Sequence, residues 1–292
     1  GALYLLALLP AAFFWRHLLR LLGQDARTGE VLHAYFVGHL GKYFPGKAMV
    51  VVIRTALIRS HRVDTGVAAV SVFMETLTLM SIGAFMAAAI LAVGFHQQIP
   101  LLLLALGVML AAGVPTLPPV FRRLVKLARV GRSDPDIIRK LDQLRFGSLF
   151  RGWVLMAAGW VCMGLSLWAV LRAMGVGEVM PFHALPRYVA SVSLAMVAGF
   201  LSLVPGGALV REAILTSLMV PYLTIAAPDK SAEAVALVSA IVLRLVWIAA
   251  EITLSGLLSL GKLHLFSALK GRNLFLLFLM LSCLSVFMTL PW

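Results

Sequence analysis

Two proline–glycine breaks inside apolar stretches constrain the fold of this chain more than any other feature. They lie in the segments FPGKAMVVVIR (residues 44–54) and VPGGALVRE (residues 204–212). Proline removes a backbone hydrogen-bond donor, and glycine adopts the positive φ angle that a tight reversal requires. As helices, the apolar arms beside each break reach about 18–24 Å, whereas the hydrocarbon core of a bilayer is about 30 Å thick. Each segment therefore predicts a re-entrant hairpin that turns back at membrane depth.

The rest of the chain is apolar enough for a membrane protein. The sequence has 292 residues, of which 61% are hydrophobic and 13% are charged. A water-soluble domain of this length requires far more polar surface, so we predict an all-α, polytopic membrane protein. Because the chain begins with glycine, we expect a fragment or processed form with a shortened first span. About six full spans are expected besides the hairpins, at residues 1–22, 65–95, 101–120, 152–174, 233–260 and 273–292.

The basic residues of this chain, whose net charge is +13, lie mainly in loops. Residues 121–151 contain nine Lys and Arg and three Asp, with apolar residues between them. This pattern favours amphipathic helices on an anionic membrane surface rather than a nucleic-acid partner. If both hairpins re-enter, the basic loops all fall on one side of the membrane, which the positive-inside rule assigns to the cytoplasm. We therefore expect a multi-pass protein of the cell inner membrane with a cytoplasmic central loop.

The order of segments predicts an inverted-topology repeat. Each half reads span, hairpin, span, span, and PGKAMV aligns with PGGALV without a gap. The first repeat is expected at residues 1–120 with its hairpin at 31–58, and the second at 152–292 with its hairpin at 183–219. Residues 121–151 form the basic linker between them. In transporters built this way, the binding site lies near the midplane, between the repeats.

Charged residues at membrane depth are the candidates for function, because each one costs about 2.5–3.5 kcal/mol on insertion scales unless it faces a partner or a cavity. Basic side chains near the breaks would clamp a phosphate or carboxylate, assisted by free N–H groups at the start of the second hairpin arm. The alternative is that they snorkel to an interface or neutralise nearby carboxylates. The expected substrate-binding residues are Lys47, Arg54, Glu75, Arg211, Glu212, Arg244 and Glu251. The expected hairpin breaks are Pro45, Gly46, Pro205, Gly206 and Gly207.

The repeat also predicts a specific contact. Glu75 and Arg244 lie near the middle of corresponding spans, so we expect them to face each other, directly or through the substrate. The alternative is that each pairs with another neighbour. Lys42 and Arg187 are further charges at depth, His33, His39 and His183 are interpreted as packing residues, and Trp15, Trp153 and Trp292 as interfacial anchors.

The motifs for nucleotide hydrolysis and for metal binding are absent from the sequence, which contains no GxxxxGK[ST], no HExxH and no CxxC. We therefore expect no cofactor, no metal and no catalytic residue.

Three blocks of the chain resemble the lysylphosphatidylglycerol synthase transmembrane family: GKYFPGK with the following arginine, the acid in VFMETLTL, and above all FLSLVPGGALVREAIL. The resemblance extends over nearly the whole chain, and the PGG-x-x-x-RE block is its most specific element. It implies a lipid-flippase-like membrane module with paired re-entrant helices. The positions that match the family are Pro45, Gly46, Arg54, Glu75, Pro205, Gly206, Gly207, Arg211, Glu212 and Arg244.

These observations together predict a transporter that moves a phospholipid or a lipid-linked head group between leaflets. The expected partner is an anionic or zwitterionic membrane lipid; a separate synthase or transferase and a second copy of this chain are further candidates. One alternative is a membrane-embedded lipid-phosphate transferase, with Glu75, Glu212, Glu251 or a histidine as its general base. The other is a non-transporting membrane subunit of a lipid-modifying synthase.

Overall fold

The computed structural model describes residues 1–44, 48–60, 62–94, 99–127, 146–176, 182–202, 204–226 and 231–261. These residues form helices and short turns, and no β-strand occurs among them. The helices of the first half are α1 (Ala2–Leu21), α2 (Thr28–His39), the 3₁₀ turn η1 (Leu40–Tyr43), α3 (Ala48–Ile58), α4 (Thr65–Gly94), α5 (Ile99–Gly113), η2 (Val114–Thr116) and α6 (Pro118–Leu127). Those of the second half are α8 (Phe146–Leu171), the π-helical turn η4 (Arg172–Val176), η5 (Phe182–Ala184), α9 (Leu185–Leu201), η6 (Pro205–Gly207), α10 (Val210–Ala226) and α11 (Ala232–Gly261).

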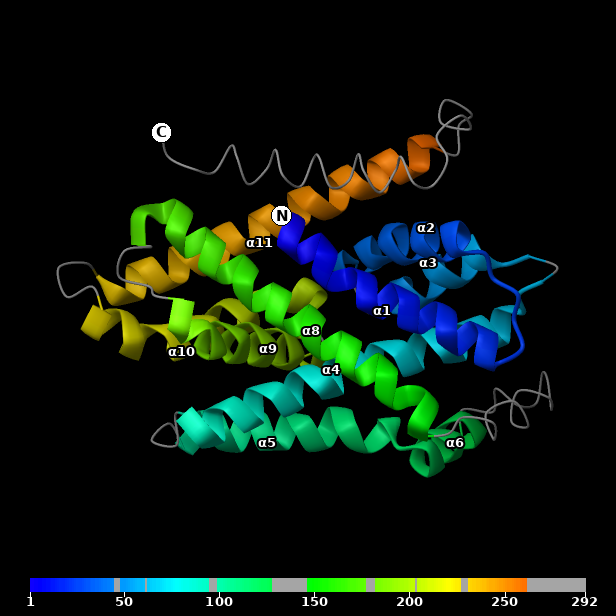
Figure 1. Ribbon diagram of the computed structural model, residues 1–292, viewed down its shortest axis with the longest axis horizontal. Helices are drawn as coiled ribbons and strands as arrows, with labels where there is room; N and C mark the ends of the chain where they lie inside the picture. Colours follow the sequence, from blue (N-terminus) through cyan, green and yellow to red (C-terminus); the bar gives the residue numbers. More distant parts are fainter. Residues whose placement is uncertain are drawn as a thin grey trace.

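The two hairpins occupy opposite ends of the molecule along its longest axis. In Figure 1, α2 and α3 lie on the right and α9 and α10 on the left, and the turns that join the arms point toward the middle. The arms of each hairpin pack against each other, and η1 of the first hairpin contacts η6 of the second. The turn η1, which precedes the first break, and the turn η6 at the second break are therefore brought together at the centre of the bundle.

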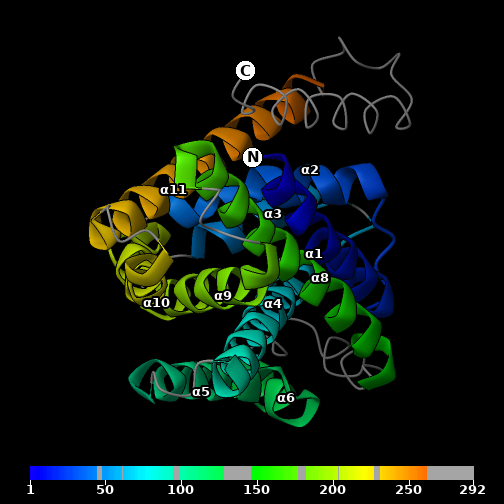
Figure 2. The ribbon, with the colours of Figure 1, turned by 60° about the vertical axis from the view of Figure 1, so that its left-hand side comes forward.

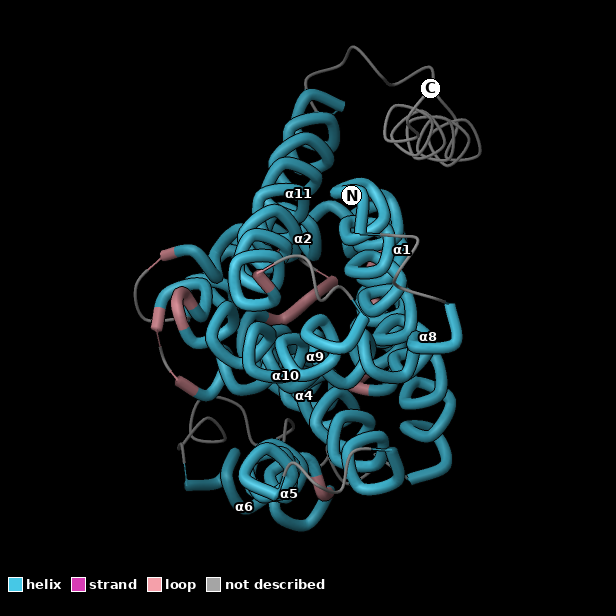
Figure 3. The backbone as a smooth tube through the Cα atoms, turned by 90° about the vertical axis from the view of Figure 1, so that its left-hand side faces the viewer, coloured by secondary structure: helices cyan, strands magenta, loops and turns pink. Residues whose placement is uncertain are grey.

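The long helices surround this centre, and several of them pack against helices of the other half of the chain. Helix α4 packs against α9, and α11 packs against α2, while α1 and α8 pack extensively against each other. Figures 2 and 3 show α5 and α6 together at one side of the bundle, with α4 between them and α11. Helices α4 and α11, which have 30 residues each, thus contact the first hairpin arm of the other half.

The helices are long and apolar enough to make this a multi-pass membrane protein. Six described segments satisfy the length and hydropathy of a membrane span: Ala2–Leu21, Thr65–Val93, Gly152–Val176, Phe182–Leu201, Pro205–Ile225 and Ala232–Leu260. The all-α polytopic fold predicted from the sequence is confirmed. The set differs from the expected one, because it contains both arms of the second hairpin and does not include α5, which has 15 residues.

The two hairpins differ in the length of their arms. In the first, α2 has 12 residues and α3 has 11, so each arm reaches only about 17–18 Å. In the second, α9 and α10 have 17 residues each, and α10 continues through Pro221 to Ala226 rather than ending at Met219 as expected. A proline inside a membrane helix is tolerated where neighbouring groups satisfy the freed carbonyl. Re-entrance is therefore a stronger proposal for the first hairpin than for the second.

Helix α1 is largely enclosed, second among the described spans to Phe182–Leu201. Tyr4, Leu8, Trp15 and Leu18 are each at most 1% exposed, and the Trp15 indole N–H donates to the Ser71 hydroxyl of α4 at 2.8 Å. The interpretation of Trp15 as an interfacial anchor is wrong, because this indole lies in the core. In the second half, Trp247 of α11 donates to Ser166 of α8 at 2.9 Å.

Some predicted features lie outside the described residues. These are Pro45, Gly46 and Lys47 of the first break, Trp292, most of the basic linker, and the last expected span at residues 273–292.

Candidate functional site

The backbone of the second break places two charged residues at the centre of the bundle. Gly206 and Gly207 have φ angles of 59° and 65°, which side-chain-bearing residues rarely adopt, and Leu209 has a φ of 66°. The chain reverses through η6 and re-enters a helix at Val210. Arg211 and Glu212 therefore lie in the first turn of α10, where backbone N–H groups have no partner within the helix.

Glycines make room for the Arg211 side chain beside this turn. A Cβ atom on Gly199 would lie 2.5 Å from Arg211 Cγ, and one on Gly207 would lie 2.6 Å from Arg211 Nε. The first hairpin uses the same arrangement, because a Cβ on Gly38 would lie 2.4 Å from Arg54 Cγ. In each hairpin, a glycine of the first arm lets an arginine of the second arm pack against its backbone.

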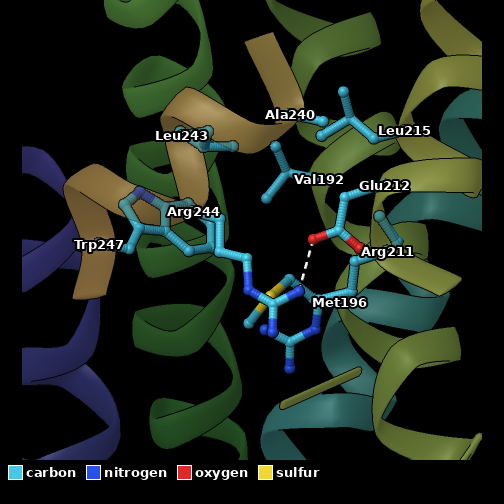
Figure 4. Close-up of a pocket in the computed structure, with 10 residues that line it drawn as sticks. Val192, Met196, Arg211, Glu212, Leu215, Ala240, Leu243, Arg244 and Trp247 are labelled. Carbon is cyan, nitrogen blue, oxygen red and sulfur yellow. Dashed lines mark hydrogen bonds and ion pairs between the residues drawn. The ribbon is translucent and has the colours of Figure 1, made fainter. Parts of the chain in front are cut away.

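Arg211 and Arg244 line the same small cavity, and Arg244 pairs with the carboxylate of Glu212. Arg244 Nη1 donates to Glu212 Oε1 at 2.6 Å, with 27% of the arginine and 12% of the glutamate side chain exposed. Figure 4 shows the Arg211 side chain extending toward the guanidinium group of Arg244. Arg211 Nε is buried and has no hydrogen-bond partner among the described residues. The positive charge of Arg211 is therefore not neutralised by a direct ion pair with a described residue.

A second carboxylate, that of Glu251 in α11, binds several side chains from the first half of the chain. Lys42 Nζ of η1 lies 2.5 Å from Glu251 Oε1, and the Tyr43 hydroxyl donates to Oε2 at 2.9 Å. The Tyr4 hydroxyl of α1 also donates to Oε1, and His39 Nε2 of α2 lies 3.6 Å from the same oxygen. The Glu251 side chain is 1% exposed.

A third ion pair joins the first hairpin to α4. Arg54 Nη1 donates to Glu75 Oε2 at 2.6 Å, and the two side chains are only 2% and 1% exposed. The guanidinium carbon of Arg54 lies 3.9 Å from the centre of the Tyr35 ring, and the Tyr35 hydroxyl donates to Glu75 at 3.3 Å. His39 connects this pair to the Glu251 cluster, because its Nδ1 lies 3.4 Å from Arg54 Nη2.

A small cavity adjoins some of these residues, and a larger cavity is lined by other residues. The cavity beside the second break has a volume of about 30 Å³ and is lined by Arg211, Glu212, Arg244 and Trp247, together with apolar residues of α9, α10 and α11. A larger cavity of about 620 Å³ lies where α4 and α10 end and α9 begins. His183, Arg187 and Tyr222 line it, and the Arg187 guanidinium carbon lies 4.4 Å from the centre of the Tyr222 ring.

A comparison with known protein families gives a match over most of the chain. Residues 2–250 match the family described as the lysylphosphatidylglycerol synthase TM region. The chain belongs to this family. The resemblance based on the PGG-x-x-x-RE block is thereby confirmed. The comparisons with curated proteins and with solved structures found no match.

Within this member of the lysylphosphatidylglycerol synthase TM family, the structure brings most of the predicted site residues to the centre. Arg211, Glu212 and Arg244 share one cavity, and Glu251 lies two helical turns beyond Arg244 on α11. The prediction that Glu75 and Arg244 pair directly is wrong. Glu75 pairs with Arg54 and Arg244 with Glu212, because each charge finds an opposite charge within its own half of the chain.

Sequence reasoning gave no role to several residues of this cluster. The sequence predicts Lys42 only as a charge at membrane depth and His39 only as a packing residue. Tyr43 precedes the first break by two positions, so its place in the motif GKYFPGK could have identified it. Tyr4 lies in an apolar helix, where a tyrosine resembles any core aromatic residue. Among the described residues, no group of three or more His, Cys, Asp or Glu side chains is arranged to hold a metal.

Proposed function

We propose that this protein is a lipid flippase-like transporter that moves a phospholipid or a lipid-linked head group between leaflets. Arg211 carries this proposal, because it is a cation at membrane depth without a paired carboxylate among the described residues. An uncompensated charge is expensive at this depth, and an anionic ligand would neutralise it. Membership of a family named for the membrane region of a phospholipid synthase supports a lipid as that ligand.

The surroundings of Arg211 suit the phosphate of a head group. Arg244 lies beside it, and the N-terminus of α10 directs backbone N–H groups and the positive end of the helix dipole toward the same place. Among the described residues, the central cluster contains four cations (Lys42, Arg54, Arg211 and Arg244) and three carboxylates (Glu75, Glu212 and Glu251). A head group with one negative charge would balance this part of the cluster.

Movement of the head group requires the centre of the protein to open. The cavity of about 30 Å³ has room for about one or two water molecules, and a phosphate with its substituents needs more space. In an inverted repeat, one half rocks against the other and exposes the midplane site to each side in turn. The exchanged contacts, α4 with α9 and α11 with α2, support such a repeat, as does the meeting of η1 and η6. The acyl chains would remain in the lipid during this movement.

Transport can be measured with the purified protein in phosphatidylcholine vesicles that contain fluorescent phosphatidylglycerol or fluorescent phosphatidylethanolamine. We expect dithionite to quench the inner-leaflet label as it exchanges outward, and Arg211→Gln to slow this exchange at least tenfold. Arg20→Gln, at the exposed end of α1, is the matched control and should exchange lipid at the wild-type rate. Absence of exchange with both lipids would overturn the proposal, and a chemically altered lipid would favour the transferase instead.

The proposed orientation places the basic loops in the cytoplasm of a cell with this protein in its inner membrane. In a background without the native cysteines, Asp25→Cys between α1 and α2 should react with an impermeant maleimide only from the cytoplasm. Ser231→Cys, just before α11, should react only from the opposite side, and both positions are exposed. Labelling of the two positions from the same side would contradict the proposed topology.

A further inference from the structure

The Lys42–Glu251 ion pair differs from the other two ion pairs of the cluster in what it connects. Arg54 and Glu75 both belong to the first half, on α3 and α4, and Glu212 and Arg244 both belong to the second half, on α10 and α11. Lys42 lies in η1 of the first half, whereas Glu251 lies in α11 of the second. Among the described residues, this is the ion pair between a lysine or arginine and a carboxylate that spans the two halves.

We propose that Glu251 binds one proton in each transport cycle and thereby couples lipid movement to a proton gradient. This inference rests on the proposed function. Rocking of one half against the other leaves the Arg54–Glu75 and Glu212–Arg244 pairs intact, but it separates Lys42 from Glu251. Removing one partner of a buried ion pair is strongly destabilising, because the remaining charge is left in a low dielectric. A proton on Glu251 abolishes that charge at the moment of separation.

The groups around Glu251 are suited to delivering and holding this proton. Helix α1 contributes Tyr4, α2 contributes His39, and η1 contributes Lys42 and Tyr43. His39 is the one among these that ordinarily exchanges protons near neutral pH. The nearby cations of the second half are Arg211 of α10 and Arg244, which lies two turns from Glu251 on α11. Helix α8 contributes Ser166, which bonds to Trp247 of α11 and does not titrate.

Release of Lys42 also serves substrate binding. Once Glu251 is protonated, the Lys42 ammonium group is without its carboxylate, and it becomes available to a head group held by Arg211. One negative head group and one proton that enter together leave the net charge of the cluster unchanged. Lipid and proton would therefore move in the same direction.

The test uses the same vesicles with the interior one pH unit more alkaline than the exterior. For one proton per lipid, labelled phosphatidylglycerol should accumulate in the inner leaflet by up to about tenfold, since one pH unit corresponds to about 1.4 kcal/mol. Glu251→Gln resembles the protonated carboxyl group and cannot release a proton, so its labelled lipid should distribute equally whatever the gradient. Glu233→Gln, at an exposed position in the first turn of the same helix, should accumulate lipid as the wild type does.

Further measurements distinguish a failure of proton coupling from a failure of the proposed transport function. Exchange of phosphatidylglycerol by the wild type with no response to the gradient would overturn proton coupling and leave the proposed function standing, whereas absence of any exchange would overturn the proposed function. If Glu251→Gln folds poorly, the double variant Lys42→Gln/Glu251→Gln leaves neither charge unpaired and should also show no response to the gradient. In the wild type, addition of phosphatidylglycerol should produce an infrared carboxyl carbonyl band that shifts in D₂O, unlike the ester carbonyl bands of the lipid, and that band should be missing from the double variant; its absence from the wild type contradicts the inference.

Discussion

Arg54→Gln is expected to lower the free energy of unfolding by about 3–5 kcal/mol, because it leaves the Glu75 carboxylate in the core without its cation. The pair is the most deeply buried of the three in the described part of the protein, with side chains 2% and 1% exposed. Glu75→Gln should have a similar effect, since it leaves the Arg54 guanidinium group above the Tyr35 ring without its carboxylate. Denaturant titration of the purified protein in mixed micelles, or its midpoint of thermal aggregation, measures both effects.

A double-mutant cycle identifies the partner of Glu75. The double variant Arg54→Gln/Glu75→Gln should recover part of the loss, because neither charge then remains alone, and the interaction energy should reach about 1–3 kcal/mol. Glu75→Gln combined with Arg244→Gln serves as the control, and the effects of these two changes should add, because the two residues belong to different ion pairs. Additive effects for Arg54 and Glu75, or strong coupling of Glu75 to Arg244, would contradict the pairing described above.

The positions of the charges could be predicted from the sequence, but their pairing could not. Insertion cost alone indicates that a charge in an apolar helix needs a partner. The choice of partner depends on how each helix is rotated about its axis, and the apolar pattern fixes rotation weakly when a helix is apolar on all sides. Lys42 and Glu251 are separated by 209 positions in the chain, so only the meeting of η1 with α11 brings them together.

The lengths of the hairpin arms were partly predictable. The break at Pro205–Gly207 is predictable because the effect of proline and glycine on the backbone is local. The far end of the second hairpin was misjudged, because Pro221 resembles a helix terminator and yet lies inside α10. Tertiary packing decides whether a helix continues through such a proline, and the sequence of the helix itself does not contain that information.

The second break differs from an ordinary loop because its glycines combine an unusual backbone with a lack of space. Gly206 has a φ of 59°, and a Cβ at this position would lie 2.9 Å from Arg244 Nη2 and 3.3 Å from Tyr43 Cδ1. Tyr43 belongs to the turn of the first hairpin, so Gly206 is also where the two turns make close contact. A side chain here would strain the backbone, displace a site arginine and push the hairpins apart.

Gly206→Leu should therefore reduce folded yield and lipid exchange more strongly than the same substitution at an exposed helical glycine with open space around it. The left-handed conformation costs a residue with a side chain about 1–2 kcal/mol, and forcing extra atoms into a packed site adds about 1–3 kcal/mol. Gly256→Leu is the matched control, because Gly256 is an exposed position of α11 and a Cβ there meets nothing within 4 Å. Gly175 is unsuitable, since its φ of 72° already penalises a side chain. Gly206→Ala retains the backbone strain and the Cβ contact with Arg244, so its difference from Gly206→Leu measures the overlap that the rest of the leucine side chain adds. If Gly206→Leu matched Gly256→Leu in yield and exchange, the two hairpin turns could not be in close contact at the centre of the bundle.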